Sequence, residues 1–295
     1  MHIIITSAGH SRRFKKAGFK DPKTLLGVGD RPMIQHVFDM FSPADHFHIV
    51  VNDLQVEENP DMLERLKSMA PKVSVAIIPP HELGPVYTAL QVSGIPDGEE
   101  VIVSYNDFIV EWNYSAFVRE VHGYDGGMVS FLGFHPASFG STYYAYMRVE
   151  GSCLVEIREK QSFTKDRTQE HASAGIYYFR DWAMFKKYSQ GYMDKGNTDH
   201  PEAYVSLLYN DMVADGLKIK VHEVPRFICL GTPEDYQQYH YWWNYFNSEQ
   251  DFNKSPLPEK GIRVNLIPLA GQSRRFREFG YRAAKPLIRV RGTPM

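Results

Sequence analysis

A short segment near the N-terminus concentrates positive charge where a phosphate group could bind. The segment from Ala8 to Lys23 contains one acidic residue, Asp21, and six basic residues: Arg12, Arg13, Lys15, Lys16, Lys20 and Lys23. The segment follows the apolar run 3–6 and precedes a helical pattern that starts at Pro32. Gly9 lets the backbone approach an anion closely, and the cations match a polyphosphate. The segment therefore predicts a polyphosphate-binding loop, with a solvated basic turn as the alternative.

An aspartate at a predicted strand end is the candidate metal ligand. Asp107 comes directly after the apolar run 101–105. A carboxylate there can hold Mg²⁺ beside a triphosphate, because Mg²⁺ binds one or two carboxylates together with phosphate oxygens and water. A capping aspartate is the alternative. Farther along, Lys160 can bind a phosphate and Glu159 a polyol, although an ordinary surface charge pair gives the same pattern.

An internal repeat sets the domain organisation. The motif AGHSRRF at 8–14 recurs as AGQSRRF at 270–276, and the register continues without a gap to the end of the chain. Of the 26 positions from 8 to 33, 12 are identical in the second copy. The residues after 246 are polar with two prolines, as in a linker. We expect a complete domain at 1–246, a linker at 247–262 and a truncated second copy at 263–295.

The elements that must position these residues alternate between strand-like and helix-like patterns. This alternation predicts a Rossmann-like, doubly wound α/β fold with a mostly parallel sheet. Ligands of such sheets bind beyond the carboxyl ends of the strands, which is where 8–23, 81–89 and 106–107 would lie. From Met128 onward the sequence becomes rich in aromatic, strand-favouring residues. That region predicts an aromatic-rich extension of the same sheet.

The composition excludes several classes of protein. With 33 basic and 35 acidic residues the net charge is −2, which excludes a generally basic nucleic-acid binder or a polybasic membrane-surface protein. Cys153 and Cys229 lie far apart and form no disulfide framework, which favours a reducing, cytoplasmic setting. The apolar runs have strand length, so we expect no membrane span. The N-terminus has no basic region followed by an apolar core and a cleavage site, so we expect no signal peptide.

In their order and spacing, these motifs resemble the sugar-phosphate nucleotidylyltransferases, members of the nucleoside-triphosphate-transferase family. The opening pattern of that family is A-G-x-G-S-R-F followed by P-K-x-L, and here 8–14 reads AGHSRRF and 22–25 reads PKTL. The resemblance covers nearly all of 1–246. It continues through Gly84-Pro85-Val86, Asn106-Asp107, Glu159-Lys160, Gly175-Ile176-Tyr177-Tyr178-Phe179 and Gly231-Thr232-Pro233-Glu234-Asp235.

The resemblance implies a role for each matching residue. Arg13 and Lys23 would hold the triphosphate, and Asp107 would bind the Mg²⁺ cofactor; these three are the implied catalytic residues. The implied nucleotide-binding residues are Ala8, Gly9, Ser11, Arg12, Gly84, Pro85 and Asn106. The implied acceptor-binding residues, in a sugar-binding extension, are Glu159, Lys160, Gly175 and Glu202.

Two positions depart from the family pattern. Ser11 stands where the family has the second glycine of its loop, which would leave the backbone less free to wrap the phosphates. Cys229 stands where many members have a second metal-binding aspartate, and a thiol is a poor Mg²⁺ ligand. The site would then work with Asp107 and another acid such as Asp235, or with reduced activity.

The expected function is transfer of a nucleotidyl group from a nucleoside triphosphate to a sugar 1-phosphate, with release of pyrophosphate, for surface-polysaccharide precursor synthesis. Two alternatives stay open. One is a cytidylyltransferase acting on a small phosphorylated alcohol such as phosphocholine. The other is a catalytically weakened, nucleotide-binding regulatory module, which Cys229 motivates. We expect no nucleic-acid or membrane partner, and the sequence leaves the base, the sugar and the oligomeric state open.

Overall fold

The computed structural model describes residues 1–133, 144–196, 202–247, 271, 273–278, 280–290 and 293–294. The chain divides into two units, Met1–Ser248 and Glu249–Met295, and each is described by itself. Of the predicted linker, only residue 247 is among the described residues.

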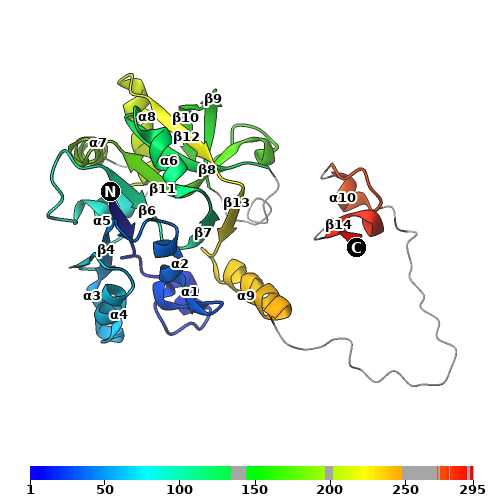
Figure 1. The fold of residues 1–295 in the computed structure, drawn as a ribbon, viewed down its shortest axis with the longest axis horizontal. Coiled ribbons are helices and arrows are strands. Elements are labelled where there is room, and N and C mark those ends of the chain that lie inside the picture. Colours follow the sequence, from blue (N-terminus) through cyan, green and yellow to red (C-terminus); the bar gives the residue numbers. More distant parts are fainter. Residues whose placement is uncertain are drawn as a thin grey trace. The chain divides into compact units, whose positions relative to one another are not determined.

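Nine strands of the described part of the first unit form one sheet (Figure 1). In spatial order they are β5 (Val73–Ile78), β4 (His46–Asn52), β1 (His2–Thr6), β6 (Val101–Ser104), β11 (His171–Phe179), β8 (Gly126–Phe131), β12 (Ile219–Glu223), β10 (Cys153–Glu159) and β9 (Ala145–Glu150). The four strands β5-β4-β1-β6 are parallel and follow the order of a doubly wound fold. The Rossmann-like α/β prediction is therefore confirmed.

The other half of the sheet is mixed, which refines the prediction of a mostly parallel sheet. β11 runs antiparallel to β6 and to β8, and β10 runs antiparallel to β12 and to β9. Only β12 and β8 are parallel in this half. The reversal at β11 brings the aromatic-rich half of the chain beside the end of β6, where the candidate site lies.

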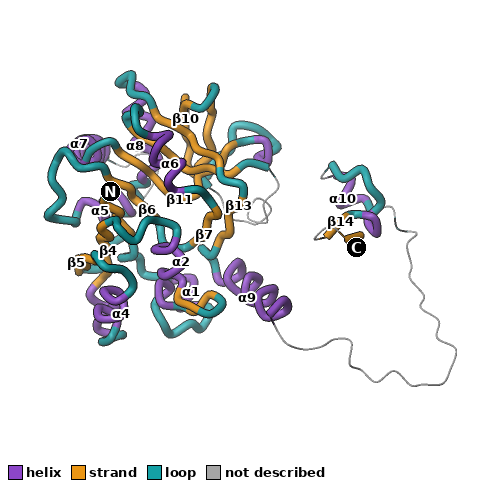
Figure 2. Tube along the Cα trace, in the orientation of Figure 1, coloured by secondary structure: helices purple, strands orange, loops and turns teal. Residues whose placement is uncertain are grey.

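Helices cover both faces of the sheet. Side chains of a strand alternate between its faces, so Ile3 and Ile5 of β1 pack with one cluster and Ile4 with the other. The first face is covered by α2 (Met33–Asp39), α4 (Met62–Ser68) and α6 (Tyr114–Val121). The second is covered by α5 (Pro85–Leu90), α7 (Trp182–Asp194) and α8 (Val205–Ala214). Each fully buried isoleucine contributes about 1.5–3 kcal/mol. Figure 2 traces the strands in orange with these helices in purple around them.

Shorter elements lie at the carboxyl ends of β1, β4 and β6. They are α1 (Arg12–Lys16), the 3-10 helix η1 (Lys23–Leu25), the hairpin β2 (Gly27–Val28) and β3 (Arg31–Pro32), and α3 (Asp53–Glu58). The predicted loop 8–23 thus contains a short helix. A separate ladder pairs β7 (Phe108–Glu111) with β13 (Arg226–Cys229), and the long helix α9 (Pro233–Asn247) follows it. The chain also contains the 3-10 helix η3 (Arg167–Gln169).

The described part of the second unit repeats elements of the first. It contains α10 (Arg274–Glu278), the 3-10 helix η4 (Lys285–Leu287), and the pair β14 (Arg289–Val290) and β15 (Thr293–Pro294). These match α1, η1, β2 and β3 in the register of the sequence repeat.

Backbone details recur as well. Ser273 has φ of 52° where Ser11 has 51°. The lysine ammonium of η4 lies 5.5 Å from the ring centroid of Phe276, and that of η1 lies 5.6 Å from Phe14. The repeated sequence therefore adopts the same local conformation in both units. Among the described residues, no helix is both long and apolar enough to cross a membrane.

Candidate active site

The carboxyl ends of β1 and β6 lie side by side, because the two strands are parallel neighbours. A hydrogen-bond network joins them just beyond the sheet. The Asn106 amide donates to Ser7 Oγ at 2.7 Å and to Thr24 Oγ1 at 3.3 Å, and the two hydroxyl oxygens are 2.5 Å apart. Asn106, implied to bind nucleotide, thus has its amide nitrogen engaged in holding η1 against the strand ends.

Lys23 and Asp107 meet next to this network. Lys23 Nζ donates to Asp107 Oδ2 at 2.6 Å, and the two side chains are 16% and 30% exposed. A charge pair that is mostly shielded from water interacts more strongly than one on the surface. The structure therefore brings together the implied triphosphate lysine and the implied metal carboxylate, from segments 84 residues apart.

The first turn of the basic loop is held against α3. The Ala8 carbonyl accepts a hydrogen bond from Asn52 Nδ2 at 2.8 Å, and the Gly9 carbonyl accepts one from Gln55 Nε2 at 3.3 Å. Ser11 then adopts the left-handed conformation at the start of α1, with φ of 51°. That conformation costs a non-glycine residue about 1–2 kcal/mol. It explains in physical terms why the family pattern has glycine at this position.

The segment before α5 contacts the basic loop through Arg12 and the residues after Glu202 through Gly84. Arg12 is exposed and forms an ion pair with Glu82. Gly84, followed by Pro85 at the first position of α5, has φ of 90°. A Cβ at Gly84 would lie 2.5 Å from the backbone nitrogen of Ala203, directly after Glu202. The implied base-side glycine and one implied acceptor residue are thus neighbours.

A cavity of about 160 Å³ lies between the end of β6 and the mixed half of the sheet. Its lining includes five of the implied site residues: Arg13, Asp107, Glu159, Lys160 and Gly175. Aromatic rings form much of the remaining wall: Tyr105, Phe108, Tyr144, Tyr177, Tyr204 and Phe227. The cavity therefore combines two cations and two carboxylates with an aromatic surface.

Gly175 shapes the floor of the cavity. It lies where the pairing of β11 with β8 shifts register, between Ser173 and Tyr177, and its φ is 88°. A Cβ there would lie 3.0 Å from the ring of Phe108 and 3.1 Å from that of Tyr105. Glycine is therefore required both by the backbone and by the close approach of two rings.

Glu159 and Lys160 close one side of the cavity. Glu159 is buried and accepts a hydrogen bond from Ser206 Oγ, and burial raises the pKa of its carboxyl although Ser206 and Lys160 partly offset this. Lys160 Nζ donates to the Tyr204 hydroxyl at 2.6 Å and lies 4.8 Å from the centroid of that ring. Burial and the carboxylate of Glu202 raise the pKa of Tyr204, so this phenol stays protonated.

Cys229 lies beside Asp107, because the β7–β13 register places it opposite Phe108. Burial and the carboxylates of Asp107 and Asp235 raise the pKa of its thiol to about 12, so the thiol is neutral. Its Sγ lies 3.4 Å from Asp235 Oδ2, an oxygen that also accepts from Thr232 Oγ1 at 2.8 Å. The carboxylate oxygens available to a hard cation here therefore come from Asp107 and Asp235, and a neutral thiol is no ligand for Mg²⁺.

Two tyrosines of the cavity were not predicted as site residues. The buried hydroxyls of Tyr105 and Tyr144 have no hydrogen-bond partner of good geometry within the described part of the chain. Such unpaired hydroxyls are costly unless a ligand or water satisfies them. The sequence gives only a weak signal for them, since aromatic residues are frequent throughout this region and most serve packing.

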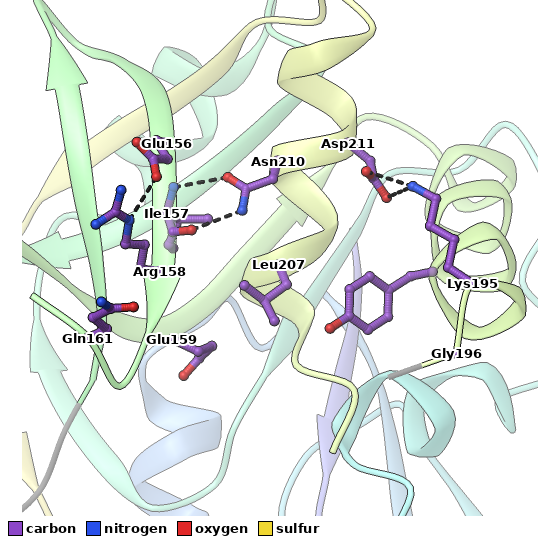
Figure 3. A pocket seen from close by; sticks show the side chains of 11 residues that line it. Glu156, Ile157, Arg158, Glu159, Gln161, Lys195, Gly196, Leu207, Asn210 and Asp211 are labelled. Atoms are coloured by element: carbon purple, nitrogen blue, oxygen red, sulfur yellow. Dashed lines mark hydrogen bonds and ion pairs between the residues drawn. The ribbon is translucent and has the colours of Figure 1, made fainter. Parts of the chain in front are cut away.

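A larger cavity, of about 610 Å³, also includes Glu159 in its lining (Figure 3). Its walls are tied together by structural contacts: Asn210 hydrogen-bonds the backbone of Ile157 in both directions, at 3.0 and 2.9 Å, and Lys195 pairs with Asp211 at 2.8 Å. Of the implied site residues it includes only Glu159. The smaller cavity is therefore the better candidate, because it contains Arg13, Asp107 and Lys160.

Comparison with known proteins agrees with this geometry. Residues 3–130 match the family model of the MobA-like NTP transferase domain. No curated protein matches the sequence of the chain. The region from β1 to β8 is thus similar in sequence to a nucleotidyltransferase domain.

Solved structures extend the likeness of fold to most of the chain. A nucleoside-diphosphate-sugar pyrophosphorylase from Vibrio cholerae RC9 is 20% identical with a TM-score of 0.66, and the match covers 81% of this chain and 99% of that chain. A Bacillus anthracis protein assigned as a glucose-1-phosphate thymidylyltransferase is 19% identical, with a TM-score of 0.62 and coverage of 86% and 99%. The inositol-1-phosphate CTP transferase from T. maritima is 14% identical, with a TM-score of 0.60 and coverage of 81% and 94%. At these identities the likeness shows the fold.

Proposed function

We propose that the chain transfers a nucleotidyl group from a nucleoside triphosphate to a sugar 1-phosphate and releases pyrophosphate. The observation that carries the proposal is the Lys23–Asp107 pair, which lies where the basic loop meets a cavity lined by Arg13 and Lys160. Cations from both sides could then hold two phosphorylated substrates end to end. The family match over 3–130 supports the reaction class. Supply of precursors for surface polysaccharides is the proposed role.

The reaction needs no side-chain base. The second pKa of a phosphomonoester is near 6, so at neutral pH the acceptor is mostly a dianion. One of its oxygens attacks the α-phosphorus, the bond from that phosphorus to the bridging oxygen breaks, and pyrophosphate carries the electron pair away. Lys23 and Arg13 would stabilise the negative charge on the triphosphate, and Lys160 would orient the acceptor phosphate.

We further propose that Asp107 holds Mg²⁺ during the reaction. The donor set fits, because Mg²⁺ commonly uses one protein carboxylate together with substrate phosphates and water. When bound, the ion would supply positive charge next to the phosphate oxygens. Lys23, which pairs with Asp107 in this structure, would contact the triphosphate.

A second candidate acceptor is a phosphorylated alcohol that carries a quaternary ammonium group, such as phosphocholine. The aromatic lining of the cavity favours it, because ring faces attract quaternary ammonium ions. The buried carboxylate of Glu159 would add to this attraction. In this case the nucleotide would be a cytidine triphosphate.

The test is a pyrophosphate-release assay that crosses each nucleoside triphosphate with sugar 1-phosphates, inositol 1-phosphate and phosphocholine, with and without Mg²⁺. We expect Mg²⁺-dependent release with one triphosphate and one acceptor class. The variants Asp107→Asn and Lys23→Ala should each lower turnover by about 100-fold or more. Lys187→Ala, which removes an exposed lysine of α7, is the matched control and should retain turnover.

Two results would contradict the proposal. Near-normal turnover in folded Asp107→Asn and Lys23→Ala would exclude the assigned site. Calorimetric binding of a triphosphate with no pyrophosphate release on any acceptor would instead favour a regulatory nucleotide-binding module.

A further inference from the structure

Three histidines meet on one face of the sheet, at the end opposite the candidate active site. His2 of β1 is the register partner of His46 of β4, and His48 lies two residues further along the same strand. Residues two apart in a strand point to the same face, so all three imidazoles share that face. His48 is buried and the other two are partly buried. The N label in Figure 1 marks this end of β1.

The three rings are in direct contact. His2 Nδ1 and His48 Nε2 are 2.8 Å apart, and the centroids of His46 and His48 are 4.3 Å apart. One nitrogen from each ring lies within 4.8 Å of the others. Within the part of the chain that the structure describes, this is the single group of three or more histidine, cysteine or acidic residues that meets so closely.

We propose that His2, His46 and His48 form a binding site for a divalent transition metal ion of the Zn²⁺ type. Neutral imidazole is a preferred ligand of Zn²⁺, Co²⁺, Ni²⁺ and Cu²⁺, whereas Mg²⁺ and Ca²⁺ require oxygen ligands. Three protein nitrogens leave a fourth tetrahedral position for water. The site is therefore chemically distinct from the hard-cation site proposed at Asp107.

Charged groups of both signs lie near the cluster. The carboxylates of Asp45 and Glu99 would attract a cation bound at His2, whereas the N-terminal ammonium would repel it. Asp45 also pairs with the N-terminal ammonium, at 3.5 Å.

A second layer of contacts would orient the ligands. His46 Nε2 lies 2.8 Å from Ser74 Oγ, and Ser74 belongs to β5, the next strand of the sheet. This contact leaves Nδ1 of His46 for the metal, as outer partners do in known metal sites. Binding requires the ligand nitrogens, which lie within 4.8 Å of one another, to move to the spacing of a tetrahedral ion. Nitrogens on a tetrahedral Zn²⁺ are about 3.3 Å apart, given bonds of roughly 2.0–2.1 Å, so His2 and His48 would separate slightly from 2.8 Å.

Metal binding would leave the total number of protons on the three imidazoles unchanged. The hydrogen bond between His2 Nδ1 and His48 Nε2 would break, and the ring that donates it would carry its proton on its other nitrogen instead. Neutral imidazoles therefore release no net proton. The ion would join β1 to β4 about 13 Å from the end of β1 that leads into the basic loop, at 3.3 Å per strand residue. We therefore assign it a structural role.

The experiment uses the full chain without a polyhistidine tag, stripped of metal by a chelator and dialysed. Titration with Zn²⁺ by calorimetry should show one site, and Co²⁺ should give the visible absorption of a tetrahedral nitrogen site. His2→Gln and His46→Gln, at partly exposed positions, should weaken binding by more than the approximately 10- to 100-fold that loss of an outer partner costs. Ser74→Ala should weaken it by about tenfold.

His222→Gln is the matched control, because His222 pairs with Glu120 and lies outside the cluster. It should bind Zn²⁺ as the unmodified chain does. Absence of saturable Zn²⁺ binding to the unmodified chain would overturn the proposal, whatever the variants do. Equal affinity in the unmodified chain and in folded His2→Gln and His46→Gln would also overturn it, since the ion would then bind elsewhere.

Discussion

At the residue scale, Cys229 is one of two positions at which the candidate site departs from the family pattern that the sequence resembles. Its thiol is neutral and lies against Asp235, so it withholds a charge that a carboxylate would supply. We expect Cys229→Asp to lower the melting temperature in a chelator, because three carboxylates would then crowd together. Mg²⁺ should restore stability and increase turnover, as a ligand that binds the folded state stabilises it by mass action.

Thermal melts with and without Mg²⁺ would measure this effect, and Cys229→Asn is the control of similar size without charge. Equal responses of the two variants to Mg²⁺ would show that position 229 does not reach the ion.

The raised pKa of Glu159 leads to a second prediction at this scale. Burial raises the pKa of its carboxyl, Glu202 adds to the rise, and Ser206 and Lys160 oppose it. A raised folded-state pKa means that the folded chain holds the proton more tightly than the unfolded chain. The stabilisation is complete below the unfolded pKa and is lost as the pH rises through the folded one. Glu159→Gln should therefore be more stable than the unmodified chain at pH 8, and each kcal/mol gained would raise the melting temperature by about 2–4 °C in a domain of this size.

At pH 4 the difference in melting temperature between the two proteins should shrink, and this trend is the measurement. Glu156→Gln, at an exposed ion pair of the same strand, is the control and should lack the trend. A Glu159→Gln difference that grows toward acid pH would reverse the sign and refute the assignment.

At the scale of elements, the loop before α5 depends on the packing of Gly84 against Ala203. Two backbone hydrogen bonds fix this contact, from Ala203 to the Leu83 carbonyl at 3.0 Å and from Val86 to the Ala203 carbonyl at 3.1 Å. Gly84→Ala would place Cβ 2.5 Å from a backbone nitrogen, at a φ of 90°. We expect a loss of at least about 1–3 kcal/mol in unfolding free energy.

Chemical denaturation would measure that loss, and the KM for the triphosphate should rise with it. Gly94→Ala is the control, since Gly94 has a similar φ of 81° but open space around it. If both variants lose the same stability, backbone strain alone explains the effect and the contact with Ala203 contributes nothing.

The elements also show which parts of the site can be predicted from the sequence. β1, the basic segment and the strand before Asp107 follow from local patterns, because a buried strand and a helix start each depend on neighbouring residues. The pairing of β7 with β13, which puts Cys229 beside Asp107, joins residues more than 100 positions apart and leaves no local pattern. The register shift at Gly175 and the unpaired hydroxyls of Tyr105 and Tyr144 likewise depend on three-dimensional packing.

At the scale of the whole molecule, a net charge of −2 conceals two basic segments with the same local conformation. The counterparts of Arg13 and Lys23 in the second unit are Arg275 and Lys285. Residues 263–295 contain no counterpart of Asp107, which lies 84 residues beyond Lys23 in the first unit. Residues 263–295 thus repeat two cations of the candidate site.

We therefore expect a chain that ends at Ser248 to retain pyrophosphate release within about twofold, because the first unit has its own two-faced core and holds all implied site residues. Comparison of kcat/KM and melting temperature between this chain and residues 1–295 is the measurement. Lys285→Ala in the full chain should likewise leave kcat/KM unchanged, whereas Lys23→Ala should lower it. A folded 1–248 chain that loses more than about tenfold in kcat/KM, close to 1.4 kcal/mol of transition-state stabilisation, would show instead that the second unit takes part in the reaction.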